Sequence, residues 1–125
     1  MSYYDERLHH YMYICRSPSY SGVKIGISRT RQRVPEGEAF RVRGLDSDKN
    51  YRLWKPWILE KAFYLGHFQV RHGFVAEERV REAVRERHGL ESAPKTGPTE
   101  LLPGVSARQA REIAAQILAR WSPPE

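Results

Sequence analysis

The chain of 125 residues has a single cysteine, few lysines and no long hydrophobic run. Cys15 alone cannot form a disulfide within the chain, and it excludes a zinc site built from several thiolates. No apolar run reaches the roughly 20 residues of a membrane-spanning helix, and no signal peptide precedes the first expected strand. Without internal repeats or a low-complexity linker, residues 1–125 fit one domain. These absences predict a cytoplasmic protein that does not enter membranes.

Positive charge, by contrast, is abundant and comes mainly from arginine. The formal net charge is +6, with 21 lysine and arginine residues against 15 aspartate and glutamate residues. Arginine outnumbers lysine sixteen to five. A guanidinium group binds two phosphate oxygens at once, whereas an ammonium group acts as a point charge. The composition therefore favours a nucleic acid as the partner.

Two arginine clusters differ in their surroundings. The first has few carboxylates near it in sequence and is expected to contact a nucleic-acid backbone. The second alternates with glutamates and is expected to be a solvated helix face with intrahelical ion pairs of little individual weight. The first cluster consists of Arg29, Arg31, Arg33, Arg41 and Arg43, and the second of Arg79, Arg81, Arg85 and Arg87.

Hydrophobic periodicity predicts an α+β domain with helices packed on a small, about three-stranded and mainly antiparallel sheet. Apolar residues on both faces of the third strand indicate a central or well-covered position. Pro35 and Gly37 oppose a long helix after the hairpin. The expected elements are a hairpin at about 10–28, a short helix or ordered loop at 29–44, a third strand at about 57–68, a helix at about 75–88 and a C-terminal helix at about 107–121.

Two alternating stretches, residues 11–15 and 23–28, carry the strongest functional signal. If they pair as an antiparallel hairpin with Tyr13 opposite Lys24, the aliphatic side chains gather on one face. A plain structural hairpin explains the same pattern, because tyrosine is a good strand former and strand lysines often face solvent. A glycine on the polar face would let a ligand backbone approach closely. That polar face holds Tyr11, Tyr13, Lys24 and Gly26.

The hairpin resembles that of the GIY-YIG endonuclease superfamily. Tyr11-Met12-Tyr13 stands where the family has GIY, and Lys24-Ile25-Gly26 stands where it has YIG. The lysine resembles a branch with KIG, common among phage-associated and small bacterial members. That branch often closes with threonine, glutamate and an aromatic residue before a last helix. Thr99-Glu100-Leu101 is similar, with leucine in place of the aromatic residue, and Glu100 is expected to hold this loop.

The resemblance implies a GIY-YIG-like nuclease domain that hydrolyses phosphodiester bonds in DNA with a divalent metal. Such a reaction needs an activated water, stabilisation of charge on the phosphoryl group and help for the leaving oxygen. By family position, Tyr13 helps to activate the water and Lys24 assists. Tyr11 either lines the site beside Tyr13 or is a packed strand tyrosine. Lys24 is then either an ammonium that lowers the pKa of the phenol or, if neutral, the base itself.

The resemblance also implies an arginine that binds the phosphate, one or two helical turns after the glycine. Arg33 fits this position best, with Arg29, Arg31 and Arg41 as competitors. Family members often carry a histidine or tyrosine one turn later, where this chain has Gly37.

A single glutamate on a helix holds one Mg²⁺ or Mn²⁺ ion in the resembled family. Helical phasing favours Glu77, with Glu78 and Glu86 behind it, because Glu77 lies at the edge of the apolar stripe. The structural alternative is a glutamate placed in the first turn by the helix dipole. We therefore expect Glu77 to be the metal ligand.

No segment resembles a separate DNA-reading module. Cutting both strands would then require a homodimer, and sequence specificity would require a separate partner. Because Lys24 and Gly37 depart from the usual family pattern, the alternative function is a catalytically inactive GIY-YIG-like module that binds a nucleic acid or a protein. A third interpretation is an unrelated basic domain whose hairpin matches by chance.

Overall fold

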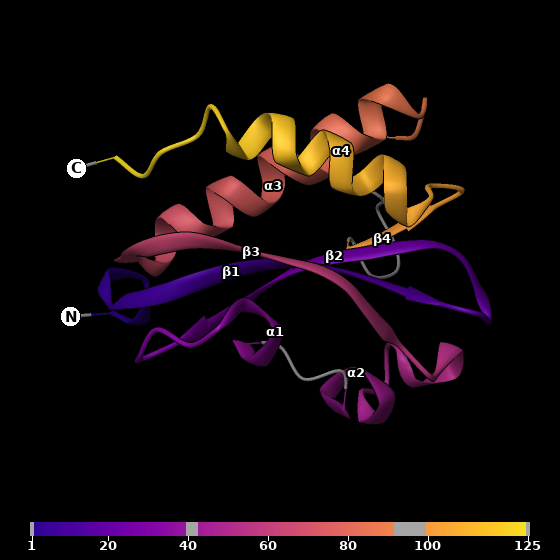
Figure 1. The fold of residues 1–125 in the computed structure, drawn as a ribbon, viewed down its shortest axis with the longest axis horizontal. Coiled ribbons are helices and arrows are strands. Elements are labelled where there is room, and N and C mark those ends of the chain that lie inside the picture. The colour runs from indigo at the N-terminus through magenta and orange to yellow at the C-terminus, as the bar shows by residue number, and fades with distance from the viewer. Residues whose placement is uncertain (1, 40–42, 92–99, 125) are drawn as a thin grey trace.

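The computed structural model describes residues 2–39, 43–91 and 100–124 and has an α+β fold. One antiparallel sheet lies between two layers of helices (Figure 1). Its strands are β1 (Arg7–Ser17), β2 (Tyr20–Thr30), β3 (Ile58–Gln69) and β4 (Leu101–Pro103), in the spatial order β3-β1-β2-β4. The helices α3 (Val70–Arg87) and α4 (Ala107–Leu118) cover one face, and the short helices α1 (Glu36–Ala39) and α2 (Arg43–Ser47) lie on the other. Two 3-10 helices span Tyr3–Asp5 and Arg52–Trp54.

The hairpin of β1 and β2 pairs two residues out of the expected register. Tyr13 lies opposite Gly26 instead of Lys24. The register shifts because β2 contains two extra residues, Ser21 and Gly22, between the pairing beside the turn and the regular ladder. A shift of two residues keeps each side chain on its expected face, since strand side chains alternate with period two.

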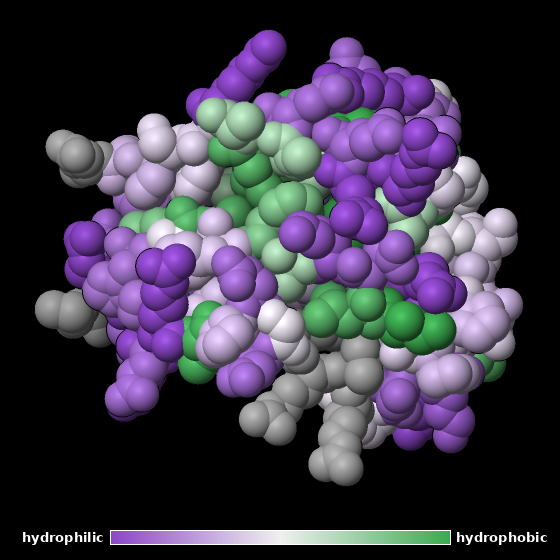
Figure 2. Space-filling model, viewed as in Figure 1, coloured by the Kyte–Doolittle hydropathy of each residue, from purple (hydrophilic) through white to green (hydrophobic). Residues whose placement is uncertain are grey.

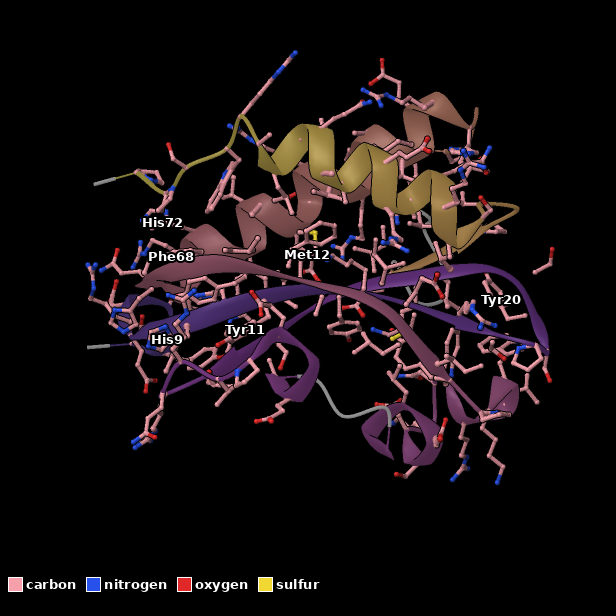
Figure 3. The ribbon with its side chains drawn as sticks, in the orientation of Figure 1. His9, Tyr11, Met12, Tyr20, Phe68 and His72 are labelled. Atoms are coloured by element: carbon pink, nitrogen blue, oxygen red, sulfur yellow. The ribbon has the colours of Figure 1, made fainter. Side chains whose placement is uncertain are left out.

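The two faces of the sheet therefore carry the expected division of side chains. Tyr11 and Met12 point to opposite sides of β1 (Figure 3). The face beneath α3 and α4 is aliphatic, and the opposite face is aromatic. The aliphatic core includes Met12, Ile14, Val23, Ile25, Val80, Val84 and Ile113, and the aromatic cluster includes Tyr13, Cys15, Leu45 and Trp57.

The structure confirms the fold class and changes several elements. The third strand is present as β3, but it lies at an edge of the sheet and β1 is central. The helix expected from residue 75 begins at Val70. It runs through Gly73, which packs against His10, since a Cβ atom at this position would lie 2.4 Å from Cδ2 of the ring. Residues 101–103, expected to belong to the closing loop, form β4 and pair with β2.

Hydrophilic side chains cover most of the molecular face shown in Figure 2, and hydrophobic ones gather in a band across its middle. Five large apolar side chains of the described chain are exposed: Tyr3, Tyr4, Leu53, Phe74 and Val75. Among the described helices, none combines the length and the apolar character that crossing a bilayer requires.

Candidate active site

The amine of Lys24 and the phenol of Tyr13 lie together on the aromatic face of the sheet. Lys24 Nζ donates a hydrogen bond to Tyr13 Oη at 2.6 Å, and only 1% of the lysine is exposed. Nζ also lies 4.7 Å from the centroids of the Tyr13 and Tyr51 rings. A buried amino group is stable only with such partners. Lys24 is therefore not the solvent-facing strand lysine of a plain structural hairpin.

Gly26 makes room for this contact. Tyr13 and Gly26 are paired on neighbouring strands, and a Cβ atom at position 26 would lie 2.4 Å from Tyr13 Oη and 3.0 Å from Lys24 Nζ. The expectation that this glycine admits a ligand backbone is wrong, because the phenol of Tyr13 fills the space.

We expect Gly26→Ala to destabilise the protein by roughly 1–3 kcal/mol, as overpacking of a core does. Gly37→Ala is the matched control, because a Cβ atom there would meet nothing within 4 Å. Alanine in a helix is more stable than glycine by roughly 0.5–1 kcal/mol, so the control should be neutral or stabilising. Urea denaturation of both variants measures the difference. Equal stability of the two variants would contradict the close packing at Gly26.

Two glutamates and Arg81 extend the cluster from the sheet to α3. Lys24 Nζ also donates to one carboxylate oxygen of Glu100, the residue before β4. Arg81 Nη1 lies 3.8 Å from the other Glu100 oxygen and 3.1 Å from a carboxylate oxygen of Glu77. A continuous series of polar contacts thus runs from Tyr13 through Lys24, Glu100 and Arg81 to Glu77.

Glu77 lies on the buried side of α3, with 5% of its surface exposed, whereas Glu78 and Glu86 are exposed. Burial raises the pKa of Glu77, and the nearby Arg81 guanidinium opposes that shift. Arg29 and Lys24 favour the carboxylate as well, and Glu100 disfavours it. The location of Glu77 agrees with the helical phasing, and its charge is coupled to the Lys24 cluster.

Arg29 brings hydrogen-bond donors without partners among the described residues to the side of α3, where its charge acts on Glu77. Its buried Nε and Nη2 atoms have no hydrogen-bond partner among the described residues. Its guanidinium carbon lies 4.5 Å from the centroid of the Phe74 ring. Leaving buried guanidinium nitrogens unpaired is costly, which marks Arg29 as a candidate for binding an anion.

His10 is the buried neighbour of Arg29. Its Nδ1 atom lies 2.9 Å from the carbonyl oxygen of Leu8, and its Nε2 atom has no partner in the described part of the chain. Burial, followed by the charge of Arg29, lowers the pKa of His10 to about 4. The ring is therefore neutral at pH 7, so it adds no positive charge beside Arg29.

The phenol of Tyr13 is held in its protonated form. Burial raises the pKa of Tyr13 well above its ordinary value, and the carboxylates of Glu100 and Glu77 raise it further. The net shift is therefore upward, opposite to the lowering of this pKa that the sequence analysis expects from a Lys24 ammonium. Tyr13 is therefore a hydrogen-bonding phenol at neutral pH.

Other residues expected at the site have different surroundings. Arg33 stacks on Tyr64, with its guanidinium carbon 4.1 Å from the ring centroid. Within the described residues, none of its contacts reaches Tyr13, Lys24 or Glu77. The structure therefore does not bring Arg33 together with the cluster.

Tyr11 anchors the chain that follows β2. Its hydroxyl donates to the carbonyl of Val34 at 2.9 Å and accepts from the N–H of the same residue at 2.8 Å. Arg31 is exposed, Arg43 begins α2, and Arg41 lies outside the described residues. Thr99 of the closing motif also lies outside them.

The second arginine cluster is only partly the solvated face that the sequence predicts. Arg81 pairs with Glu77, and Arg85 pairs with Glu82 at 2.7 Å, as intrahelical pairs. Arg85, however, is only 4% exposed, because this side of α3 packs against the sheet and α4. Arg81 belongs to the candidate site rather than to a solvated face.

The number of carboxylates in the cluster matches what a magnesium ion needs. Mg²⁺ is held in proteins by one or two carboxylates and keeps several of its waters. Glu77 and Glu100 supply two carboxylates near the same guanidinium. An ion bound to Glu77 would compete with Arg81 for this carboxylate. The described residues contain no group of three or more His, Cys, Asp or Glu side chains that could enclose a metal.

Sequence reasoning omits Glu100 and Arg81 from the site. The Thr99-Glu100 pair is the signal that could identify Glu100, since it stands at the position of the closing motif. Arg81 has no comparable signal, because its spacing from Glu77 is that of an ordinary intrahelical pair.

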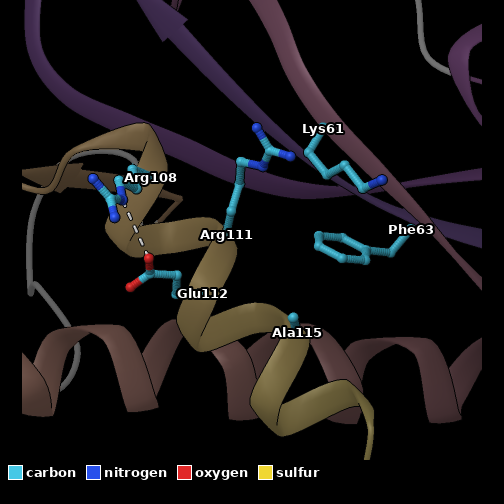
Figure 4. Close-up of a pocket in the computed structure, with 6 residues that line it drawn as sticks. All are labelled: Lys61, Phe63, Arg108, Arg111, Glu112 and Ala115. Atoms are coloured by element: carbon cyan, nitrogen blue, oxygen red, sulfur yellow. Dashed lines mark hydrogen bonds and ion pairs between the residues drawn. The ribbon is translucent and has the colours of Figure 1, made fainter.

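A separate groove lies between β3 and α4, with a volume of about 370 Å³ (Figure 4). Lys61 and Arg111 approach its opening from opposite elements, and the ring of Phe63 lies beside them. The groove contains none of the clustered side chains. It is lined by Lys61, Phe63, Arg108, Arg111, Glu112 and Ala115.

The chain matches no known protein family, no curated protein and no solved structure. The protein is therefore described by its fold and by the contacts of the clustered side chains. It is an α+β domain in which a phenol and an amine from a hairpin meet two carboxylates and a guanidinium, which come from α3 and from the residue before β4.

Proposed function

We propose that the protein is an endonuclease that hydrolyses phosphodiester bonds in DNA with one Mg²⁺ or Mn²⁺ ion, as its resemblance to the KIG branch of the GIY-YIG superfamily implies. The observation that carries this proposal is the convergence of Tyr13, Lys24 and Glu77 on one buried cluster. These residues come from three elements, β1, β2 and α3. A hairpin that matches the family motif by chance gives no reason for a buried glutamate beside it.

In this proposal, Lys24 and Tyr13 act on the attacking water and the phosphoryl oxygens. Lys24 supplies positive charge beside the phenol, and Tyr13 orients the water through its hydroxyl. Because the phenol is protonated in the free protein, it can serve as a base only after it has lost this proton, and additional positive charge at the site would favour that loss. Glu77 would hold the divalent ion, which supplies Lewis-acid polarisation of the phosphate when bound.

Arg29 replaces Arg33 as the residue that we assign to the scissile phosphate. Two of its guanidinium nitrogens are buried without partners among the described residues, and its charge acts on Glu77. A phosphate oxygen would satisfy these donors with charge-assisted hydrogen bonds. Arg33, by contrast, stacks on Tyr64 and would contact the DNA backbone outside the reacting group.

The burial of the cluster favours a second candidate function, a binding module without turnover. Tyr13 is 6% exposed and Lys24 is 1% exposed, so little of the reacting pair reaches the surface. The raised pKa of Tyr13 also opposes a role as a base. A protein of this kind would bind a nucleic acid or a protein partner through its basic surface and leave phosphodiester bonds intact.

Plasmid cleavage separates the two functions. We expect the purified protein with Mg²⁺ or Mn²⁺ to convert supercoiled plasmid into the nicked form, and EDTA to stop the reaction. DNA binding should weaken steeply as salt rises, because arginines that contact phosphates release counterions. Intact plasmid together with salt-sensitive binding would support the inactive module. Neither cleavage nor binding would contradict both functions.

A further inference from the structure

Glu100 joins the two halves of the candidate site. One of its carboxylate oxygens accepts a hydrogen bond from Lys24 Nζ, which also donates to Tyr13. The other oxygen faces Arg81 Nη1 at 3.8 Å, and Arg81 in turn pairs with Glu77. The hairpin half and the α3 half of the cluster thus meet at a single carboxylate.

The backbone holds Glu100 in this place. The carbonyl oxygen of Glu100 accepts a hydrogen bond from the N–H of Ile25 at 3.0 Å. The next residue, Leu101, pairs with Lys24 across the strands β4 and β2. The carboxylate is therefore attached to a segment that is hydrogen-bonded beside Lys24, and 28% of its side chain remains exposed.

A carboxylate in contact with Nζ determines what Lys24 can do. An ammonium has three N–H donors and no lone pair, so it cannot take a proton from water. Two of these donors are directed at Glu100 and Tyr13. Without Glu100, the amino group would remain buried with one hydrogen-bond partner fewer. Glu100 and Tyr13 together thus fix where the Lys24 amino group points.

We propose that Glu100 is a positioning residue that holds the amino group of Lys24 against the Tyr13 oxygen, so that Lys24 can stabilise negative charge that develops beside this oxygen. This inference rests on the proposed endonuclease function for its catalytic part. The contact between Lys24 and Glu100 can itself be measured in the absence of DNA cleavage.

Nitrogen-15 NMR of the lysine side chains tests the contact between Lys24 and Glu100 through the rate at which the Lys24 side-chain protons exchange with water. We expect a Lys24 ammonium signal whose protons exchange slowly with water, assigned by its loss in Lys24→Met. Glu100→Gln removes only the charge and should accelerate this exchange at least about tenfold, because the protecting partner is lost. Glu112→Gln, which removes a surface carboxylate paired with Arg108, should leave the signal unchanged. An unchanged Lys24 signal in Glu100→Gln would overturn the proposal.

Kinetics distinguish positioning from general structural support. Glu100→Gln should lower kcat by roughly 10–100-fold with little change in KM, as the loss of an orienting partner does. Glu100→Asp should restore part of kcat, whereas Arg29→Gln should mainly raise KM. A rise in KM alone for Glu100→Gln would show that Glu100 contacts substrate and does not position Lys24. Loss of the NMR protection in a protein that never cleaves DNA would support the ion pair and refute only the endonuclease.

A double variant covers the case in which Glu100→Gln folds poorly. Combining Lys24→Met with Glu100→Gln removes both charges, so no unpaired ammonium stays buried. We expect the double variant to unfold at a higher urea concentration than Glu100→Gln alone. Equal or lower resistance of the double variant would show that the two charges are not coupled, and the proposal would fail.

Discussion

Replacing Tyr13 with phenylalanine should reduce the rate of plasmid nicking by about two to four orders of magnitude, the usual contribution of a group that handles a proton in the reaction. The hydroxyl removed is the one that accepts from Lys24 Nζ at 2.6 Å. The ring itself, which packs in the aromatic cluster with Trp57, is retained, so the fold should survive. Nicking of supercoiled plasmid under saturating Mg²⁺ measures the effect, and circular dichroism checks the fold.

Tyr20→Phe is the matched control for this experiment. Tyr20 packs against Trp54 and Trp57 in the same aromatic cluster, and it is not one of the residues linked to Glu77. Its loss of a hydroxyl should leave nicking within about twofold of the wild type, since surface and partly buried changes of this kind have small effects. If Tyr13→Phe cleaves as fast as Tyr20→Phe, the phenol of Tyr13 has no part in the reaction.

Glu77→Ala should reduce nicking by at least about 100-fold, as the loss of one preorganised electrostatic group does. The substitution removes the buried carboxylate of α3 that is coupled to Lys24 and Arg29. It also leaves Arg81 with Glu100 as its carboxylate partner. Glu77→Gln keeps the side-chain volume and should lose activity to a similar extent, which separates the missing charge from a packing defect.

Glu78→Ala provides the comparison on the next residue of α3, whose side chain is exposed. It should nick plasmid at close to the wild-type rate in the same assay. The opposite pattern, with Glu78→Ala inactive and Glu77→Ala active, would show that the exposed carboxylate serves the reaction. In that case, the buried position of Glu77 would be purely structural.

Local rules of side-chain periodicity explain why so much of the fold can be predicted. Alternation along the hairpin identifies the two faces even though the register of Tyr13 and Gly26 is wrong, because an error of two residues preserves the alternation. Helical phasing identifies Glu77 as the glutamate on the buried side of α3 for the same reason. Side-chain periodicity alone, however, does not indicate which strands pair with each other.

The parts that could not be predicted depend on contacts between distant segments. The strand β4 spans only Leu101–Pro103, too short for a periodic pattern, so its pairing with β2 is invisible in the sequence. Glu100 lies 76 positions from Lys24 along the chain. The pKa of Tyr13 likewise depends on burial and on two carboxylates brought from other elements, which the neighbouring lysine in the motif does not reveal.

The late position of Glu100 has a consequence for a chain emerging from the ribosome. The hairpin with Tyr13 and Lys24 is synthesised long before the segment that carries Glu100 and α4. Until that segment adds to the free edge of β2, the amine lacks its carboxylate and the aliphatic face lacks one of its two covering helices. Any nuclease activity of the cluster would therefore have to wait until the segment with Glu100 has been synthesised and β4 has paired with β2.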